Sequence, residues 1–262
     1  MPEYRSVSQL KQFEQCGLQF KLDRIDKAWN RPAAWFDHGT AVHSAVEAFE
    51  KSGRTMTLEA AQKLAVEEYS AGINRRLADT PNADVWFESG RYRGFDDIER
   101  RAEIVPEMVA RYYDYVANNP DDCVIWVADD GTPGIELGFD IDLEGVRVRG
   151  YIDQVTDRGN TVHVRDIKTG SQPGDTFQLR VYALALEETY GVTCPTGDYW
   201  MGREGRPVPK RKPHDLTTVS RSEVVDRFHA ADEGIRAERF EPNPGEHCRR
   251  CSVKTSCPLF DN

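Results

Sequence analysis

The segment that most constrains the fold is residues 134–168, because apolar and polar side chains alternate along most of it. Alternation with period two is typical of strands that pack one face on a core. The strands are expected at 134–143, 146–156 and 161–168. Glu144-Gly145 and the run Asp157 to Asn160 are the expected turns between them. The sequence therefore predicts an antiparallel meander.

Acidic side chains occupy this meander at positions where a strand normally disfavours them. A two-residue turn at 144–145 sets three pairs opposite one another: Asp142 and Arg147, Asp140 and Arg149, and Glu136 and Asp153. The first two pairs carry opposite charges, which supports this register. The third pair brings two carboxylates side by side.

The next hairpin adds a third acid and a lysine. An even loop centred on residues 157–160 sets Asp153 across from Val164, so that Asp166 becomes a diagonal neighbour of Asp153, roughly 7–8 Å away at Cα. Lys168 follows two residues later on the same face. This arrangement depends on an even loop, because an odd one moves Asp166 and Lys168 to the other face.

Carboxylates gathered in this way repel one another unless a positive charge lies between them. Mg²⁺ or Mn²⁺ suits oxygen ligands, and such an ion can activate water and stabilise charge on a phosphate. Lys168 could then orient or deprotonate the water. The sequence supports a metal site for phosphodiester hydrolysis, and spacing alone equally allows a solvated sheet edge with a Lys–Asp pair.

The remaining chain is expected to be mainly helical before residue 120 and mixed after it. Helices are predicted at 9–22, 35–53, 57–77, 95–119, 176–191 and 220–240, and further strands at 123–128 and 196–202. Pro106 is expected to kink the fourth helix or start a turn. We expect a single mixed α/β nuclease domain over 1–262, with a helical portion at 1–120, a catalytic core at 121–205 and a C-terminal helix with a cysteine cluster at 206–262.

Composition limits the cellular location and the binding partners that can be expected for the chain. No stretch approaches the roughly 20 apolar residues of a membrane span, and the start lacks a signal-peptide core, so we expect a cytoplasmic protein without a membrane partner. The net charge of −10 argues weakly against nucleic acid, although basic residues cluster locally. One cluster contains Arg203, Arg206, Lys210, Arg211 and Lys212, and others contain Arg91, Arg93, Arg100 and Arg101. Each could also be a solvated surface.

Four short motifs together resemble the PD-(D/E)xK nuclease superfamily, and more narrowly its RecB-type exonucleases, including CRISPR-associated and phage versions. They are Gly39 to His43, Gly150-Tyr151-Ile152-Asp153, Asp166-Ile167-Lys168, and Gln178 with Tyr182. The resemblance implies a restriction-endonuclease-like core with a mixed sheet flanked by helices. It also implies metal binding by Asp153, Asp166, His43, the Ile167 carbonyl and, least securely, Glu136. Lys168 would act on the water, and the shared helix face of Gln178 and Tyr182 would lie next to the active site, toward DNA.

The C-terminal tail carries Cys248, Cys251 and Cys257, which indicates a soft-metal site with Cys16 as the candidate fourth ligand. In the resembling nucleases one early and three late cysteines bind a 4Fe-4S cluster, which here would join the two chain ends. Arg249 and Arg250 lie inside the cluster motif and could touch phosphate. Structural zinc is the alternative, and His247 is an alternative ligand. Cys123 and Cys194 are expected to be buried thiols.

The implied activity is a Mg²⁺- or Mn²⁺-dependent DNA exonuclease acting on single strands or duplex ends. Its pathway would be recombination, repair, replication or CRISPR spacer capture, in the host cytoplasm if phage-encoded. No phosphate-binding G-x-x-x-x-G-K-(S/T) motif is present, so helicase work needs a partner. Two alternatives stay open: a structure-specific endonuclease or nickase, and a DNA-binding subunit of a processing complex.

Overall fold

The computed structural model describes residues 3–260, which divide into two compact units. The first comprises Met1–Pro32, Phe139–Gly150 and Val219–Asn262, and the second Ala33–Gly138 and Tyr151–Thr218. No helix within residues 3–260 combines the length and the apolar character needed to cross a membrane.

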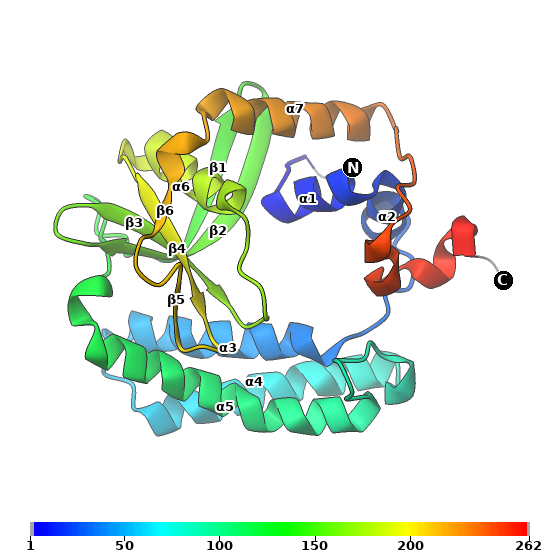
Figure 1. Cartoon of the computed structure of the whole chain (residues 1–262), viewed down its shortest axis with the longest axis horizontal. Coiled ribbons are helices and arrows are strands. Elements are labelled where there is room, and N and C mark those ends of the chain that lie inside the picture. The colour runs from blue at the N-terminus through cyan, green and yellow to red at the C-terminus, as the bar shows by residue number, and fades with distance from the viewer. Residues whose placement is uncertain (1–2, 261–262) are drawn as a thin grey trace. The chain divides into compact units, whose positions relative to one another are not determined.

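Three long helices of the second unit lie side by side (Figure 1): α3 at Ala34–Lys51, α4 at Leu58–Asp79 and α5 at Gly94–Asn118. Thr57 caps α4 by accepting a hydrogen bond from the Ala60 N–H. Small residues such as Ala61 and Ala65 are completely buried and let the helices approach closely. Together with two strand residues, Ile167 and Trp200, these helices form the main apolar core.

A six-stranded mixed sheet forms the centre of the fold. Its strands are β1 Ile135–Leu143, β2 Val146–Asp157, β3 Val162–Lys168, β4 Thr196–Met201, β5 Arg206–Val208 and β6 His214–Asp215. Their order is β1-β2-β3-β4-β5, and β6 also pairs with β4. β3 and β4 are parallel, because α6 at Thr176–Tyr190 crosses over between them. Gly191 ends α6 in the left-handed conformation at φ 66°.

The two faces of β3 are covered differently. Ile167 packs into the core with α3, α4 and α5, whereas Asp166, which points to the opposite face, contacts Gln178 and Tyr182 of α6. Short 3₁₀ segments connect the elements of this unit at Ala83–Val85, Pro120–Asp122 and Leu216–Thr218. The predicted α/β class, with a mixed sheet flanked by helices, is confirmed.

Some predicted elements are wrong in detail. Residues 123–128 form only isolated bridges, in which Ile125 pairs with Thr156 and Val127 with Pro133. Helix α5 continues past Pro106 to Asn118, so no turn begins at this proline. The basic segment at 203–212 contains β5, and β6 follows it; neither strand was predicted.

The register predicted for the first hairpin is confirmed by three contacts. The Val155 N–H donates to Gly134 O, the Tyr151 ring lies against Gly138, and the Phe139 ring lies against Gly150. Glu144 and Gly145 both have positive φ, as a tight two-residue turn requires.

The predicted ion pairs of this hairpin differ in one respect. Asp140 binds Arg149 as expected, but it also binds Arg147. Asp142 instead accepts the backbone N–H of Gly145 and so caps the turn. The predicted position of Asp142 opposite Arg147 follows from the confirmed register, but the two side chains have different partners: the turn satisfies the Asp142 carboxylate, and Arg147 binds Asp140.

The register predicted for the second hairpin is wrong by two residues. The strands pair Val155 with Val164 and Gln154 with Arg165, and the loop spans residues 158–161. The loop is still even, but its centre lies one residue later than expected. Pairing ends at Gln154 and Arg165, so Asp153 and Asp166 are the next residues along the two strands. The predicted pair of Asp153 with Val164 is therefore wrong.

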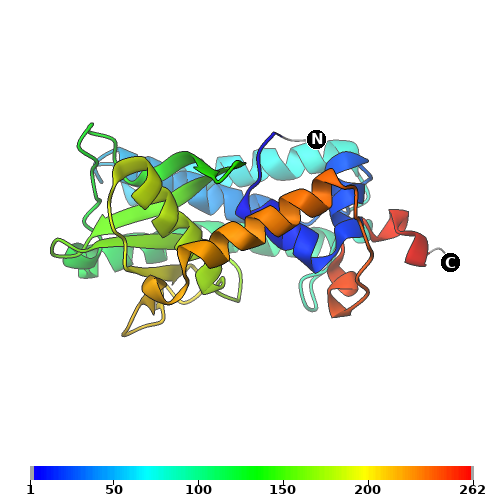
Figure 2. The same ribbon diagram turned by 90° about the horizontal axis from the view of Figure 1, so that it is seen from above.

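The first unit is built from helices at both ends of the chain, with α1 at Val7–Gln15 beside α7 at Arg221–Arg236 (Figure 2). Short helical segments complete it: α2 Gly17–Phe20, a π-helical turn Lys21–Ile25, and 3₁₀ turns Glu246–Arg250, Lys254–Ser256 and Pro258–Phe260. The rings of Phe13, Phe20 and Phe240 pack together, and the buried Arg5 pairs with Asp232 at 2.6 Å.

Candidate active site

The candidate site lies in the second unit, where β2 and β3 stop pairing. The last paired residues are Gln154 and Arg165. Just beyond them, the Asp153 carboxylate replaces a backbone partner and accepts the Ile167 N–H at 2.7 Å. This hydrogen bond from a side chain connects β2 to β3 beyond their last backbone pair. Asp153 and Asp166 lie on the same face of the two strands.

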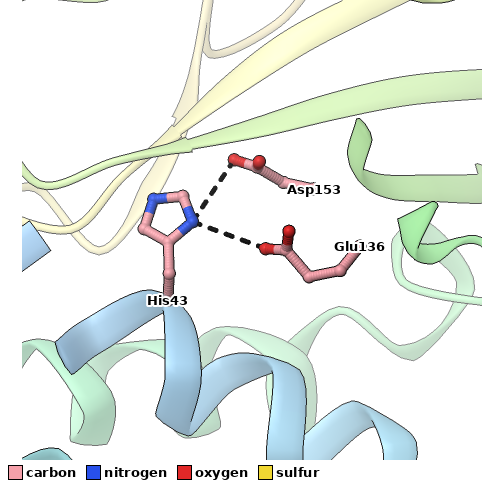
Figure 3. A group of neighbouring side chains, drawn as sticks. All are labelled: His43, Glu136 and Asp153. Atoms are coloured by element: carbon pink, nitrogen blue, oxygen red, sulfur yellow. Dashed lines mark ion pairs between the residues drawn. The ribbon is translucent and has the colours of Figure 1, made fainter. Parts of the chain in front are cut away.

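His43 reaches this point from α3 (Figure 3). Its Nε2 donates to the Ile167 carbonyl at 2.9 Å, and its Nδ1 lies 3.6 Å from Glu136 and 3.7 Å from Asp153. One ligand atom from each of His43, Glu136 and Asp153 lies within 4.8 Å of the other two. Within residues 3–260, no other set of His, Cys, Asp and Glu side chains gathers its ligand atoms this closely.

Asp166 is almost fully buried, and both of its oxygens have partners. Oδ2 pairs with Lys168 Nζ at 2.6 Å, and Oδ1 accepts from Gln178 Nε2 at 2.8 Å. The same Gln178 amide bonds to the Tyr182 hydroxyl at 2.8 Å, which lies 3.4 Å from Asp166. Gln178 and Tyr182, the two α6 residues expected to lie next to the active site and toward DNA, therefore contact Asp166. Tyr182 is only 6% exposed.

The charges of the site are strongly coupled. Burial raises the pKa of Asp153 to about 7, and the neighbouring Asp166 and Glu136 carboxylates add to this, while His43 opposes it. Burial alone would lower the pKa of His43, but Asp153, Asp166 and Glu136 raise it to about 9. The cluster thus has an excess of negative charge, which the imidazolium partly neutralises.

This donor set fits a hard divalent cation. Two carboxylates and an imidazole converge, and the Ile167 carbonyl lies beside the same imidazole. A divalent ion at this position would take over the neutralising role of the imidazolium proton. Asp166 is held beside this group, with its orientation determined by Gln178, Tyr182 and Lys168.

A buried polar cluster behind the site was not expected from the sequence. Glu50 of α3 accepts from Tyr112 of α5 at 2.7 Å and from Arg54 at 2.8 Å, and Gln154 of β2 approaches it at 3.4 Å. The cluster ties the helix that carries His43 to the strand that carries Asp153. One signal was available: Glu50 follows His43 by seven residues and Val46 by four, and so lies on the packed face of its helix.

The basic residues predicted to bind DNA occupy two separate places. Arg203, Arg206, Lys210, Arg211 and Lys212 belong to the second unit, around β5. Arg206 is half-buried and the other four are exposed. Arg249 and Arg250 are exposed in a 3₁₀ turn of the first unit. Their binding to DNA stays a prediction.

The four cysteines expected to act as ligands line one cavity of the first unit. Cys16 caps α2, and its Sγ accepts backbone N–H groups of Gln19 and Asn243, each at 3.4 Å. Cys248 Sγ accepts the Gly245 N–H at 3.4 Å. Residues far apart in the sequence therefore meet around sulfur atoms that already accept hydrogen bonds, as metal-bound thiolates do.

The thiols of this cavity also interact electrostatically. Burial raises the pKa of Cys251, and the nearby Cys16, Cys248 and Cys257 raise it further. A metal centre bound by these cysteines would stabilise their thiolate form. His247 lines the same cavity. Cys123 and Cys194 are buried elsewhere, as predicted.

Comparison with known proteins gives a consistent picture. The family model described as "PD-(D/E)XK nuclease superfamily" matches residues 4–258. The "Gene 69 protein" of Mycobacterium phage D29 is 46% identical over 262 residues, covering 98% of this chain and 97% of that protein. The "Gene 69 protein" of Mycobacterium phage L5 is 43% identical over 281 residues, covering 98% and 96%. A solved structure described as "Crystal structure of SSO0001" has a TM-score of 0.33 at 15% identity, over 63% of this chain and 76% of that one, which is too low to support a conclusion.

Proposed function

Because the chain belongs to the PD-(D/E)XK nuclease superfamily, we propose that it is a divalent-metal-dependent DNA exonuclease that acts on single strands or duplex ends. The observation that carries the proposal is the convergence of Glu136, Asp153 and His43, with Asp166 and Lys168 beside them, at the end of one sheet. We place it in the RecB-like group, as one functional nuclease domain over 1–262.

The proposed roles follow from the contacts. Glu136, Asp153, Asp166, His43 and the Ile167 carbonyl would hold Mg²⁺ or Mn²⁺, which when bound would activate a water molecule and neutralise charge on the phosphate. Lys168 can donate a hydrogen bond to that water or to a phosphate oxygen, or accept the proton of the water when itself neutral. Gln178 and Tyr182 hold the Asp166 carboxylate in place. The exposed basic side chains around β5 and at Arg249 and Arg250 would contact the DNA backbone.

The test compares linear with circular single-stranded DNA, end-labelled where an end exists, in the presence of Mg²⁺ or Mn²⁺. An exonuclease degrades the linear strand progressively from an end and leaves the circle intact. Rapid cutting of circles would replace the exonuclease with an endonuclease or nickase. Purified protein that leaves all DNA substrates uncut with either metal would favour a DNA-binding subunit of a processing complex instead.

We further propose that Cys16, Cys248, Cys251 and Cys257 bind a 4Fe-4S cluster that links the two ends of the chain. The shared cavity and the backbone N–H groups directed at sulfur support it. Its role would be structural, since closing so long a loop in the unfolded chain stabilises the fold by about 5–6 kcal/mol in a loop-entropy model.

Cys251→Ala is expected to abolish the visible absorption of the protein, release its iron and lower its Tm, because three thiolates cannot complete the ligand set. The measurement is iron and sulfide content, visible spectrum and thermal unfolding of protein purified without oxygen. Cys194→Ala is the matched control and should keep its iron, since Cys194 is a buried thiol outside the cavity. A colourless wild type with one zinc per chain would assign the site to structural zinc.

The biological process, the cellular location and the partner protein are also proposals. The relatives encoded by mycobacteriophages support a role in phage DNA metabolism in the host cytoplasm. A helicase or recombination protein is the proposed partner, because the sequence has no ATP-binding loop of its own.

A further inference from the structure

Tyr151 is the most exposed large apolar side chain in residues 3–260, at 66%. It precedes Asp153 by two residues on β2, so the two side chains point to the same face, roughly 7 Å apart along the strand. Its hydroxyl makes no hydrogen bond within the described part of the chain. The Tyr151 ring, beside the proposed metal ligands, is thus open to solvent, and no described side chain or backbone group binds its hydroxyl.

The opposite strand leaves room for this ring. Gly138 lies across from Tyr151, and a Cβ at Gly138 would approach the ring to 3.2 Å. The Tyr151 ring therefore packs against the Gly138 backbone on one side, and its other side is open to solvent. A flat ring supported on one side can stack on a nucleobase.

A second exposed ring lies on the helix that supplies His43. Phe36 is 49% exposed and precedes His43 by seven residues, which places both on one face of α3, roughly 10 Å apart along its axis. Gly39, on the same face, packs next to Thr169, the residue after β3. The Arg76 guanidinium lies 5.5 Å from the Phe36 ring centre, so a cation accompanies this ring.

We propose that Tyr151 and Phe36 are base-stacking residues that hold unpaired nucleotides of the substrate next to the proposed metal centre. In a duplex, both faces of each base are stacked on the neighbouring base pairs. A site that stacks on bases therefore selects DNA that is single-stranded or whose strands have been separated. The proposal rests on the nuclease function proposed above and adds the groups that would select the substrate.

The binding test uses the Lys168→Ala protein, which should hold DNA without cutting it. Adding Tyr151→Ala or Phe36→Ala is expected to weaken binding to a single-stranded 20-mer by about 5- to 100-fold, the range for loss of one base–aromatic stack. Tyr151→Phe should change the Kd less than about 2-fold, because stacking needs the ring and not the hydroxyl. Binding is measured by fluorescence anisotropy with Mg²⁺, and stacking by quenching of 2-aminopurine in the strand.

Two controls separate stacking from a general defect. Phe95→Ala removes an equally exposed ring at the start of α5 and should bind as the parent does. A strand of the same length with abasic positions should bind the parent weakly, and Tyr151→Ala or Phe36→Ala should then add no further loss. An equal loss on intact and abasic strands, or no loss on either, would overturn the stacking proposal.

Cleavage by the wild type is measured in parallel. If it degrades single strands while Tyr151→Ala and Phe36→Ala bind like the parent, the stacking proposal is wrong and the nuclease function stands. If the wild type cuts no DNA while both substitutions weaken binding to intact strands alone, the stacking proposal stands for a DNA-binding protein and the nuclease function is wrong.

Discussion

Replacing Lys168 with alanine is expected to lower kcat for DNA cleavage by about 10²- to 10⁴-fold, the usual effect of losing a group that acts on a proton in the transition state. Lys168 Nζ lies 2.6 Å from Asp166, and its side chain is 29% exposed, so it can reach both the proposed metal ligands and an incoming strand. The Kd for single-stranded DNA should change little, since one cation among several is removed. Single-turnover cleavage and DNA binding of the same preparation check both expectations.

A second substitution at this position separates the two roles left open for the lysine. Arginine keeps the positive charge but cannot give up its proton. If Lys168→Arg restores cleavage, the role is electrostatic, and if it stays inactive, the role is proton transfer. Lys63→Ala is the matched control, because Lys63 is an exposed lysine of α4 with a long ion pair, 3.7 Å, to Glu67. Cleavage by Lys168→Ala at the wild-type rate would contradict both roles.

The largest loss of stability is expected from Asp198→Asn. Arg165 is completely buried between β3 and the helices, and both oxygens of Asp198 accept from it, at 2.8 and 3.0 Å. Asp122 also pairs with Arg165, but it is about one-third exposed. Removing one partner of a buried pair leaves an uncompensated charge, which costs about 3–5 kcal/mol. The Tm should fall by roughly 6–20 °C.

Thermal and denaturant unfolding of the two proteins measure this difference. Glu67→Gln is the control, since it breaks an exposed pair that contributes less than about 1 kcal/mol. A shift for Asp198→Asn no larger than that of the control would show that the Arg165 charge is compensated by other groups.

The pH dependence of this effect has a definite sign. Burial alone would raise the pKa of Asp198, but the Arg165 guanidinium holds it well below its usual range. A carboxyl whose pKa is lowered by folding stabilises the folded state fully above its unfolded pKa of about 3.9, and this stabilisation is lost as the pH falls through the folded pKa. The stability gap between wild type and Asp198→Asn should therefore be constant at neutral pH and shrink only in strong acid.

The local elements were accessible from the sequence because each has a short-range cause. The turn at Glu144-Gly145 sets the register of the first hairpin, and Gly191 ends α6. The residues of the candidate site could be named because acids and a lysine in strands conflict with strand propensity. His43 was named from a resemblance, and nothing local to α3 indicated which strands it would meet.

The register of the second hairpin could not be predicted, for a specific reason. Moving the loop centre by one residue changes each partner by two, which keeps every side chain on the same face. Alternation of Val155, Val164 and their neighbours is therefore satisfied equally by both registers, and the tertiary structure selects the one that pairs Val155 with Val164.

The amino-acid sequence by itself predicted the long helices, the meander of β1, β2 and β3, and strand β4, because these depend on residue type and near neighbours. It also named the carboxylates and cysteines that are proposed as metal ligands. Only the tertiary structure decided that Gln178 and Tyr182 support Asp166, that Glu50 joins α3 to β2, and that Arg165 is neutralised by Asp198. Each of these contacts joins residues on different elements, and burial in a common core makes the pairing necessary, since a buried polar group without a partner is costly.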